Sequence, residues 1–267
     1  MNLILSPHLD DAALSLGGLL SKEGATSVVA TFFAGTPQSL EPSRWDRKCG
    51  FTDSAHAMNE RLQENARSLG LLGVLDGHIR NYEHLDLEYR SNPSNSQGEE
   101  QDLTDSLIQE ISTLVQEFSS LPLKVFIPSF EVHRDHALIK RAALEGMRTD
   151  APSKQFFMYQ DIPYAFKLLE EDRSRFFWNY YSRKSPHTWR YSVLKNKLGG
   201  TTDAVSPFFI PLTNADLQKK IAAIAAYTSQ VPHLGKDVLK TTEEFASAQA
   251  KFFSIDSPYC EVAYKIM

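Results

Sequence analysis

Two short stretches of this chain place residue types that can do chemistry at close spacing. Residues 6–11 read SPHLDD, and residues 133–136 read HRDH. Two imidazoles and a carboxylate that leave coordination positions open suit a divalent catalytic metal, with zinc first among the candidates. The same ligand types hold ferrous iron for oxygen chemistry, so the sequence leaves the metal open.

Both stretches follow an apolar strand and come just before a helical pattern. These strands are predicted at 3–5 (LIL) and 124–127 (KVFI), and another at 27–33 (SVVATFF) completes a strand-helix-strand unit. Such a unit predicts a parallel sheet. Because the carboxyl ends of parallel strands lie at one edge of a sheet, the two stretches can meet although more than a hundred residues separate them.

Each stretch alone has an ordinary explanation. Asp10 and Asp11 stand where an N-cap and a dipole-favoured acid would precede a helix, and His133 and His136 would be polar loop residues. Short motifs often match by chance. Their joint occurrence at equivalent places in the β-α pattern favours a site.

The remaining pattern predicts an α/β fold: a Rossmann-like, mostly parallel sheet with flanking helices. Helices are expected at 10–24, 55–69, 103–118, 137–147, 214–227 and 241–252, and further strands at 71–75, 155–159 and 259–266. Residues 35–54 and 77–101 read as loops, and 91–101 is polar enough to be disordered or a lid. We expect a single domain, with the core at 1–150 and an aromatic-rich elaboration of the substrate pocket at 151–267.

Composition limits the class of protein. A net charge of −5 over 267 residues gives no basic footprint for nucleic acid. No run approaches the roughly 18 apolar residues of a membrane span, and the first residues lack a signal-peptide pattern. Cys49 and Cys260 form no paired spacing. We expect a cytoplasmic protein that acts on a small molecule, with homo-oligomerisation left open.

Together with the glycine pair at 17–18 and three later segments, the two stretches resemble the PIG-L/LmbE-like family of metal-dependent N-acetylglucosaminyl deacetylases. The family's first motif usually reads Pro-His-Pro-Asp-Asp-Glu and its second His-x-Asp-His. Residues 61–64 (RLQE), 159–164 (YQDIPY) and 226–230 (AYTSQ) resemble three further family segments, in the family's order. The resemblance implies a Rossmann-like, usually zinc-dependent enzyme that hydrolyses the N-acetyl group of glucosamine-type sugars.

Carried over position by position, the resemblance implies that His8, Asp11 and His136 bind the metal and that Asp10 is the general base. Amide hydrolysis needs a polarised carbonyl and a nucleophile that exists at neutral pH, and a metal ion provides both. A carboxylate beside the metal is well placed to take the proton of the attacking water.

The resemblance also implies supporting residues. His133 would stabilise the oxyanion or protonate the leaving amine, and Asp135 would orient His133. Arg61, Asp161 and Tyr164 would contact the substrate. From the residues alone, Arg61 would equally be a surface side chain paired with the acid three positions on, and the aromatic residues of the C-terminal half would mostly be core.

Two positions depart from the family motif: Leu9 replaces the usual proline, and Ala12 the usual glutamate. The leading hypothesis is a zinc-dependent hydrolase that removes an N-acetyl or other N-acyl group from a glucosamine-type amino sugar or its conjugate. One alternative is another metal-dependent amide or ester hydrolase of the same fold. The other is a non-catalytic, sugar-binding relative, which rests on Ala12 alone.

Overall fold

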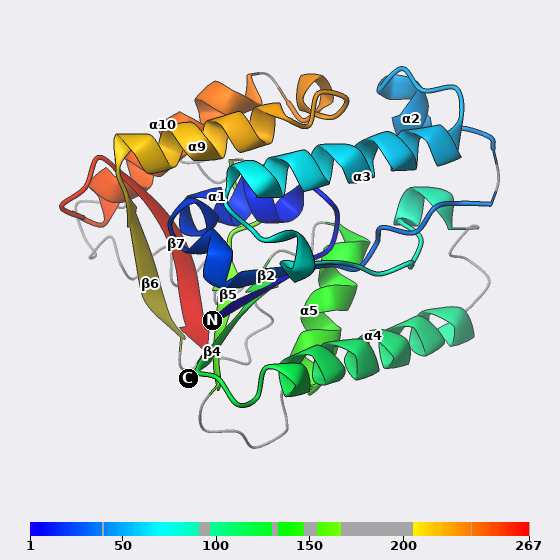
Figure 1. The fold of residues 1–267 in the computed structure, drawn as a ribbon, viewed down its shortest axis with the longest axis horizontal. Helices are drawn as coiled ribbons and strands as arrows, with labels where there is room; N and C mark the ends of the chain where they lie inside the picture. Colours follow the sequence, from blue (N-terminus) through cyan, green and yellow to red (C-terminus); the bar gives the residue numbers. More distant parts are fainter. Residues whose placement is uncertain are drawn as a thin grey trace, which may run out of the picture.

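A seven-stranded sheet runs through the centre of the molecule (Figure 1). The computed structural model describes residues 1–38, 40–90, 97–129, 133–146, 154–166, 205–235 and 237–266. The strand order is β3-β2-β1-β4-β5-β7-β6. Five strands are parallel: β1 (Asn2–Ser6), β2 (Ser27–Thr31), β3 (Ile79–Asn81), β4 (Leu123–Pro128) and β5 (Lys154–Tyr159). At the far edge β7 (Tyr259–Ile266) is antiparallel to both β5 and β6 (Val205–Leu212). The predicted α/β, mostly parallel sheet is confirmed.

Helices cover both faces of this sheet (Figure 1). One face carries α1 (Asp11–Glu23), α3 (Ser54–Leu71) and α9 (Asn214–Ala225); the other carries α4 (Gln97–Glu117) and α5 (Arg134–Gly146). Helix α10 (Val238–Phe252) packs on β7, and the short α2 (Arg44–Lys48) lies within the 35–54 loop.

In β1, Leu3 and Leu5 join the apolar cluster under α4 and α5, while Ile4 joins the cluster under α1 and α9. Because β1 is buried on both faces, its three central residues are all apolar, and the buried polar residues at its ends, Asn2 and Ser6, are held by hydrogen bonds.

Several boundaries differ from the sequence predictions. The predicted strand at 71–75 is wrong: α3 runs to Leu71, and a turn through Gly73 (φ +80°) leads to β3 at 79–81. A short leucine-rich run at a helix end cannot be told from a strand by periodicity. Helix α4 begins at Gln97, so 97–101 of the candidate lid is helical, while 91–96 lies outside the described residues. So do residues 167–204, which hold most of the predicted aromatic half.

Helix α1 is bent, and residues from β7 and α9 meet it at the bend. Leu16 has non-helical backbone angles (φ −126°, ψ 19°). The backbone amides of Gly18 and Leu19 donate to the carboxylate of Glu261 on β7 at 2.7 and 2.9 Å. The ammonium of Lys220 on α9 lies 2.6 Å from the same carboxylate. The buried acid therefore satisfies the amides that begin the second half of the helix, as an N-cap would.

The glycine pair of the first motif explains this close approach. A Cβ atom at Gly17 would lie 2.7 Å from Cγ of Lys220, and one at Gly18 would lie 2.5 Å from Cδ1 of Leu212. Any side chain here would push α9 and β6 away from α1. The pair thus sets the packing of the helix that begins at the candidate site.

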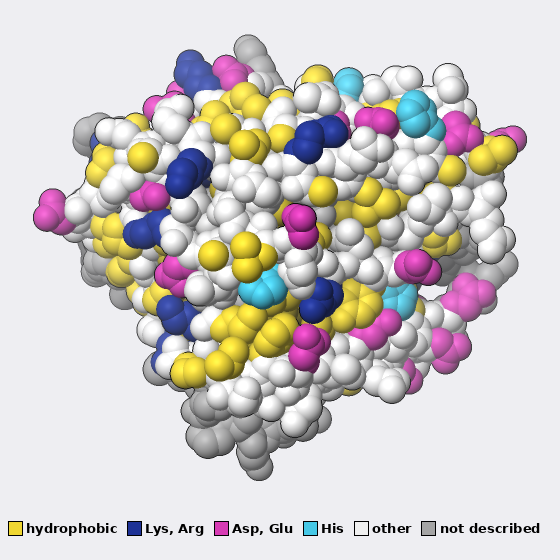
Figure 2. All heavy atoms as spheres, in the orientation of Figure 1, with side chains coloured by type: hydrophobic (Ala, Val, Ile, Leu, Met, Phe, Trp, Pro, Cys, Tyr) yellow, Lys and Arg dark blue, Asp and Glu magenta, His cyan; other side chains and the backbone are white. Residues whose placement is uncertain are grey.

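On the face shown in Figure 2, acidic and basic side chains are interspersed over the described part of the surface. This face gives a polyanion no continuous basic stripe. Among the described helices, none has the length and apolarity that crossing a membrane requires.

Candidate active site

The turn between β1 and α1 is organised by the side chains of Ser6 and Asp11 and not by that of Asp10. Its hydroxyl donates to the backbone oxygen of His8 at 2.7 Å and accepts from the backbone amide of Ala12 at 3.1 Å. Asp11 accepts from the backbone amide of His8 at 2.8 Å. Asp10 occupies the N-cap position, but its carboxylate makes no capping hydrogen bond. Helix capping therefore does not account for Asp10.

The two histidine-aspartate stretches meet at one edge of the sheet because β1 and β4 are neighbours. Oδ2 of Asp11 lies 3.2 Å from Nδ1 of His8 and 3.2 Å from Nε2 of His136. The ring of His133 stands edge-on to that of His8, with centroids 4.8 Å apart. Nitrogen atoms of the three histidines lie within 4.8 Å of one another. The structure thus brings together all the residues for which the sequence predicts metal binding.

The surroundings of His136 fit a metal ligand. Its Nδ1 lies 2.6 Å from Oδ1 of Asp161, whose Oδ2 accepts from the backbone amide of Ser129 at 2.8 Å. Its Nε2 is buried, has no hydrogen-bond partner, and faces Asp11. Metal-binding histidines characteristically have one ring nitrogen fixed by a carboxylate and the other turned to the ion. The donor set of His8, Asp11 and His136 therefore suits a divalent cation.

Buried carboxylates dominate the electrostatics of this site. Burial alone would lower the pKa of His8, but three acids outweigh it and raise that pKa well above its usual value (Asp86, Asp11 and Asp135). Burial would likewise lower the pKa of His136, and the two carboxylates beside its ring raise it to about 9. Both shifts favour the protonated imidazoles, and a divalent cation would compete with those protons for the ring nitrogens.

Asp10 and His133 line the same cavity as His8 and Asp11 of the donor set. Burial and the neighbouring charge of Asp11 raise the pKa of Asp10, which makes its carboxylate a stronger base. Burial and the positive charge of His8 lower the pKa of His133, which makes its imidazolium a stronger acid. The pair is suited to moving protons on a bound molecule.

The cavity measures about 250 Å³ and is also lined by Arg61 and Tyr164. Arg61 is buried, and its Nη1 lies 3.8 Å from Oδ2 of Asp86. The acid three positions on, Glu64, accepts a hydrogen bond from Ser229 instead. The interpretation of Arg61 as a surface side chain paired with that acid is therefore wrong. Tyr164 stands edge-on to His136, with ring centroids 5.5 Å apart. Asp161 is fully buried behind that histidine and does not line the cavity.

Asp135 lies against His8 more closely than against His133. Its Oδ2 is 3.1 Å from Nε2 of His8 and accepts from the backbone amide of Leu87 at 3.0 Å, and Arg90 pairs with its other oxygen. The distance from Oδ2 to Nδ1 of His133 is 4.0 Å. Asp135 therefore ties His8 to the turn at residues 86–90.

Sequence reasoning missed Asp86. It is buried within that turn, and its carboxylate lies 3.8 Å from Nε2 of His8 and 3.8 Å from Arg61. No motif marks it, because it follows β3 in a mixed stretch that also holds Glu83 and Glu88. It also belongs to a second group of possible ligands with His8, His133 and Asp135. Arginines already neutralise both acids of that group, so the first donor set suits a cation better.

The two positions that depart from the family motif face the core. Leu9 packs with Ala34 and Met58, and its backbone oxygen accepts from the hydroxyl of Tyr227 at 2.8 Å. Ala12 is fully buried in the apolar cluster under α1 and α9. Neither side chain lines the cavity of about 250 Å³ that holds the candidate site.

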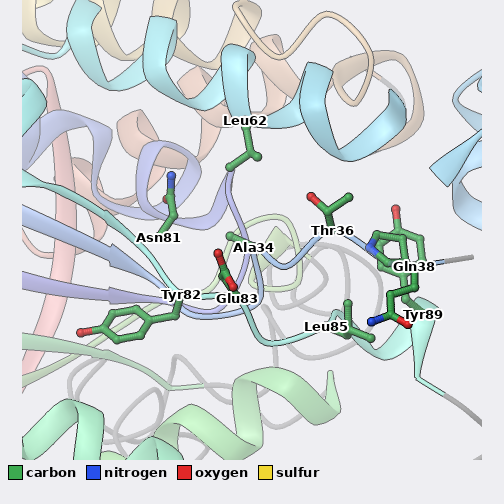
Figure 3. A pocket seen from close by; sticks show the side chains of 10 residues that line it. Ala34, Thr36, Gln38, Leu62, Asn81, Tyr82, Glu83, Leu85 and Tyr89 are labelled. Carbon is green, nitrogen blue, oxygen red and sulfur yellow. The ribbon is translucent and has the colours of Figure 1, made fainter. Parts of the chain in front are cut away.

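A second hollow of about 720 Å³ shares the 86–90 turn with this cavity (Figure 3). Its walls come from α3 and from segments 34–38 and 81–89, and Leu62 points from α3 towards Ala34. Among its described lining residues there is no histidine, and Glu83 is the single acid. It is larger, but it lacks the groups for metal chemistry.

Comparison with known proteins identifies sequence relatives of this chain. Residues 3–147 match the family model described as PIG-L: GlcNAc-PI de-N-acetylase. The 2'-N-acetylparomamine deacetylase of Streptomyces fradiae is 30% identical over 174 residues, covering 61% of this chain and 57% of that protein. The chain thus spans little more than half the length of this curated relative.

Two solved structures share the fold. The zinc-inhibited form of the teicoplanin deacetylase Orf2 is 22% identical with a TM-score of 0.73, covering 100% of this chain and 97% of that chain. GalB, the 4-carboxy-2-hydroxymuconate hydratase of Pseudomonas putida KT2440, is 14% identical with a TM-score of 0.60, covering 100% and 95%. Because a protein named as a deacetylase and one named as a hydratase share this fold, the fold alone does not decide the reaction.

Proposed function

Because this chain belongs to the PIG-L family of de-N-acetylases, we propose that it is a zinc-dependent hydrolase that removes an N-acetyl or other N-acyl group from a glucosamine-type amino sugar or its conjugate. The observation that carries the proposal is the convergence of His8, Asp11 and His136, with Asp10 and His133 beside them. The cavity of about 250 Å³ lies at the small end of ligand pockets, which run to roughly 300–1,000 Å³. It suits one sugar ring better than a whole conjugate.

Three residues would hold the metal: His8, Asp11 and His136, the number of protein ligands usual in catalytic zinc sites. When bound, the ion supplies Lewis-acid polarisation of the amide carbonyl and lowers the pKa of water. Asp161 keeps the proton of His136 on Nδ1, so that Nε2 carries the free lone pair. We therefore propose a positioning role for Asp161 in place of the substrate contact expected from sequence.

The protein's own residues would move the protons. Asp10 takes a proton from the water that attacks the carbonyl carbon, and burial suits it to this role by raising its pKa. His133 gives a proton to the nitrogen as the C–N bond breaks, leaving a carboxylic acid and a free amine. Arg61 and Tyr164 line the cavity where they can contact the sugar.

The non-catalytic alternative loses its support at Ala12. That side chain is buried in an apolar cluster and does not line the cavity. Asp10 and His133, which the chemistry needs, are both present at the cavity. The remaining alternative, another amide or ester hydrolase, is separated from the proposal by experiment.

The test is to incubate the purified protein with zinc and a panel of N-acetyl amino sugars, and to follow free amine. We expect amine release that a chelator abolishes and added zinc restores. His136→Ala should lose both zinc and activity. Protein that holds zinc yet frees no amine from any sugar would overturn the proposal, and cleavage of aryl esters alone would favour the other hydrolase.

A further inference from the structure

The short helix α2 carries Trp45 to the wall of the catalytic cavity. A capping box begins this helix, in which Ser43 and Asp46 each accept the other's backbone amide. The buried carboxylate of Asp46 also accepts from the hydroxyls of Ser54 and Tyr89, at 2.8 Å each. α2 is therefore fastened to α3 and to the 86–90 turn, and Trp45 stands on a fixed support.

A chain of partly buried hydrogen bonds fixes one edge of the indole ring. Nε1 of Trp45 donates to Oε1 of Gln230 at 2.6 Å, and Nε2 of Gln230 donates to the hydroxyl of Ser229 at 2.7 Å. That hydroxyl donates to Glu64 at 2.7 Å, and Glu64 also accepts from the backbone amide of Ser229 at 2.7 Å. In this chain every N–H group donates, every carbonyl or carboxylate oxygen accepts, and the Ser229 hydroxyl does both. Turning the Gln230 amide over would set two donors against each other.

A cation also holds the ring from outside the cavity. The ammonium of Lys48 lies 4.5 Å from the ring centroid of Trp45 and donates to the backbone oxygen of His233 at 3.2 Å. Lys48 does not line the cavity. Trp45 therefore brings apolar ring surface to the cavity. Its indole N–H already has an acceptor, and its ring already has a cation contact.

The geometry points to Trp45 as a specificity-determining residue: we propose that its indole packs against the C–H face of the substrate's sugar ring, with Gln230 and Glu64 as positioning residues. This inference rests on the proposed function. The indole face is negative and attracts C–H groups, which carry partial positive charge. Because the ring is fixed before binding, little side-chain entropy is lost on stacking. The charged pair of Arg61 and Asp86 lines the same cavity and is suited to the hydroxyl groups.

The kinetic test compares two substrates that share the acetamide: a methyl glycoside of N-acetylglucosamine, and N-acetylethanolamine, which has no ring. For Trp45→Ala we expect KM for the glycoside to rise about tenfold, with kcat and the ring-free substrate nearly unchanged. Gln230→Met should move the same KM by a smaller factor. Arg47→Ala is the matched control, because Arg47 is exposed on the same helix. An equal loss on both substrates, or an unchanged glycoside KM, would overturn the inference.

A binding test separates this inference from the proposed function. The methyl glycoside of glucosamine should change the tryptophan emission of the zinc-loaded wild type, and Trp45→Phe should remove that change while keeping the melting temperature. Binding that depends on Trp45 without any amine release supports the stacking and refutes only the deacetylase. Absence of binding to the wild type, or an emission change that persists in Trp45→Phe, overturns the inference itself.

Discussion

Replacing Asp161 by asparagine should weaken zinc binding without removing any of the proposed ligands. Oδ1 of Asp161 lies 2.6 Å from Nδ1 of His136, and Oδ2 accepts from the backbone amide of Ser129 at 2.8 Å. A carboxylate accepts on both oxygens, whereas an amide accepts on only one. The variant must therefore lose the acceptor either for His136 or for the backbone amide of Ser129.

Both orientations of the new amide are unfavourable. If its nitrogen faces His136, it donates to Nδ1, and the ring proton moves to Nε2, the atom that the metal needs. If its nitrogen faces Ser129, two donors meet, and the buried backbone amide loses its acceptor at a cost of about 1–3 kcal/mol. Loss of such a partner typically lowers metal affinity by about 10–100-fold, which is about 1.4–2.8 kcal/mol.

The assay is competition for zinc with a chromophoric chelator near neutral pH. Asp216→Asn is the matched control, because it makes the same chemical change at the N-terminal cap of α9. We expect the zinc Kd to rise by about 10–100-fold for Asp161→Asn and to stay at the wild-type value for the control. A wild-type Kd for Asp161→Asn, or equal losses in both variants, would refute the reasoning.

Three further predictions concern the base, the glycine pair and a helix cap. Asp10→Asn should lower turnover by about 10²–10⁴-fold at unchanged zinc content. Gly18→Ala should lower the free energy of unfolding in urea by about 1–3 kcal/mol, because its Cβ would lie 2.5 Å from Leu212. For Asp216, partial burial would raise the pKa, but hydrogen bonds from Thr213 outweigh it and lower the pKa. Its stabilising effect is therefore present above the unfolded pKa of about 3.9 and lost as pH falls through the folded pKa, so the melting temperatures of wild type and Asp216→Asn should converge in acid.

Each of these has a control or a contrary outcome. Full turnover in Asp10→Asn would remove that residue as the base. Gly70→Ala is the control for the glycine pair, since a Cβ there meets nothing within 4 Å, and equal losses at both glycines would contradict the packing argument. A melting-temperature gap at position 216 that widens in acid would show that the carboxylate does not stabilise the cap.

Local pattern was enough to predict the parts of the fold that depend on local physics. The centre of the β1 strand, buried on both faces, is the apolar run at 3–5, and that run together with its flanking residues predicted the strand. The family match over residues 3–147 confirms the resemblance. The prediction of a strand at 71–75 was wrong because a leucine run at the end of a helix has the same composition as a short strand.

At the candidate site, the sequence by itself predicted that the two histidine-aspartate stretches come together. Both follow parallel strands, whose carboxyl ends lie at one edge of the sheet, so their meeting required only the sheet topology. The tertiary structure decided how those groups pair. His136 is fixed by an acid 25 positions later, and Arg61 turns inward to Asp86. Trp45 is fixed at the cavity in part by Gln230, 185 positions away, which accepts its indole N–H. Spacing along the chain reports strand and helix periods, whereas partners across the fold are selected by packing, burial and the need to satisfy every buried polar group.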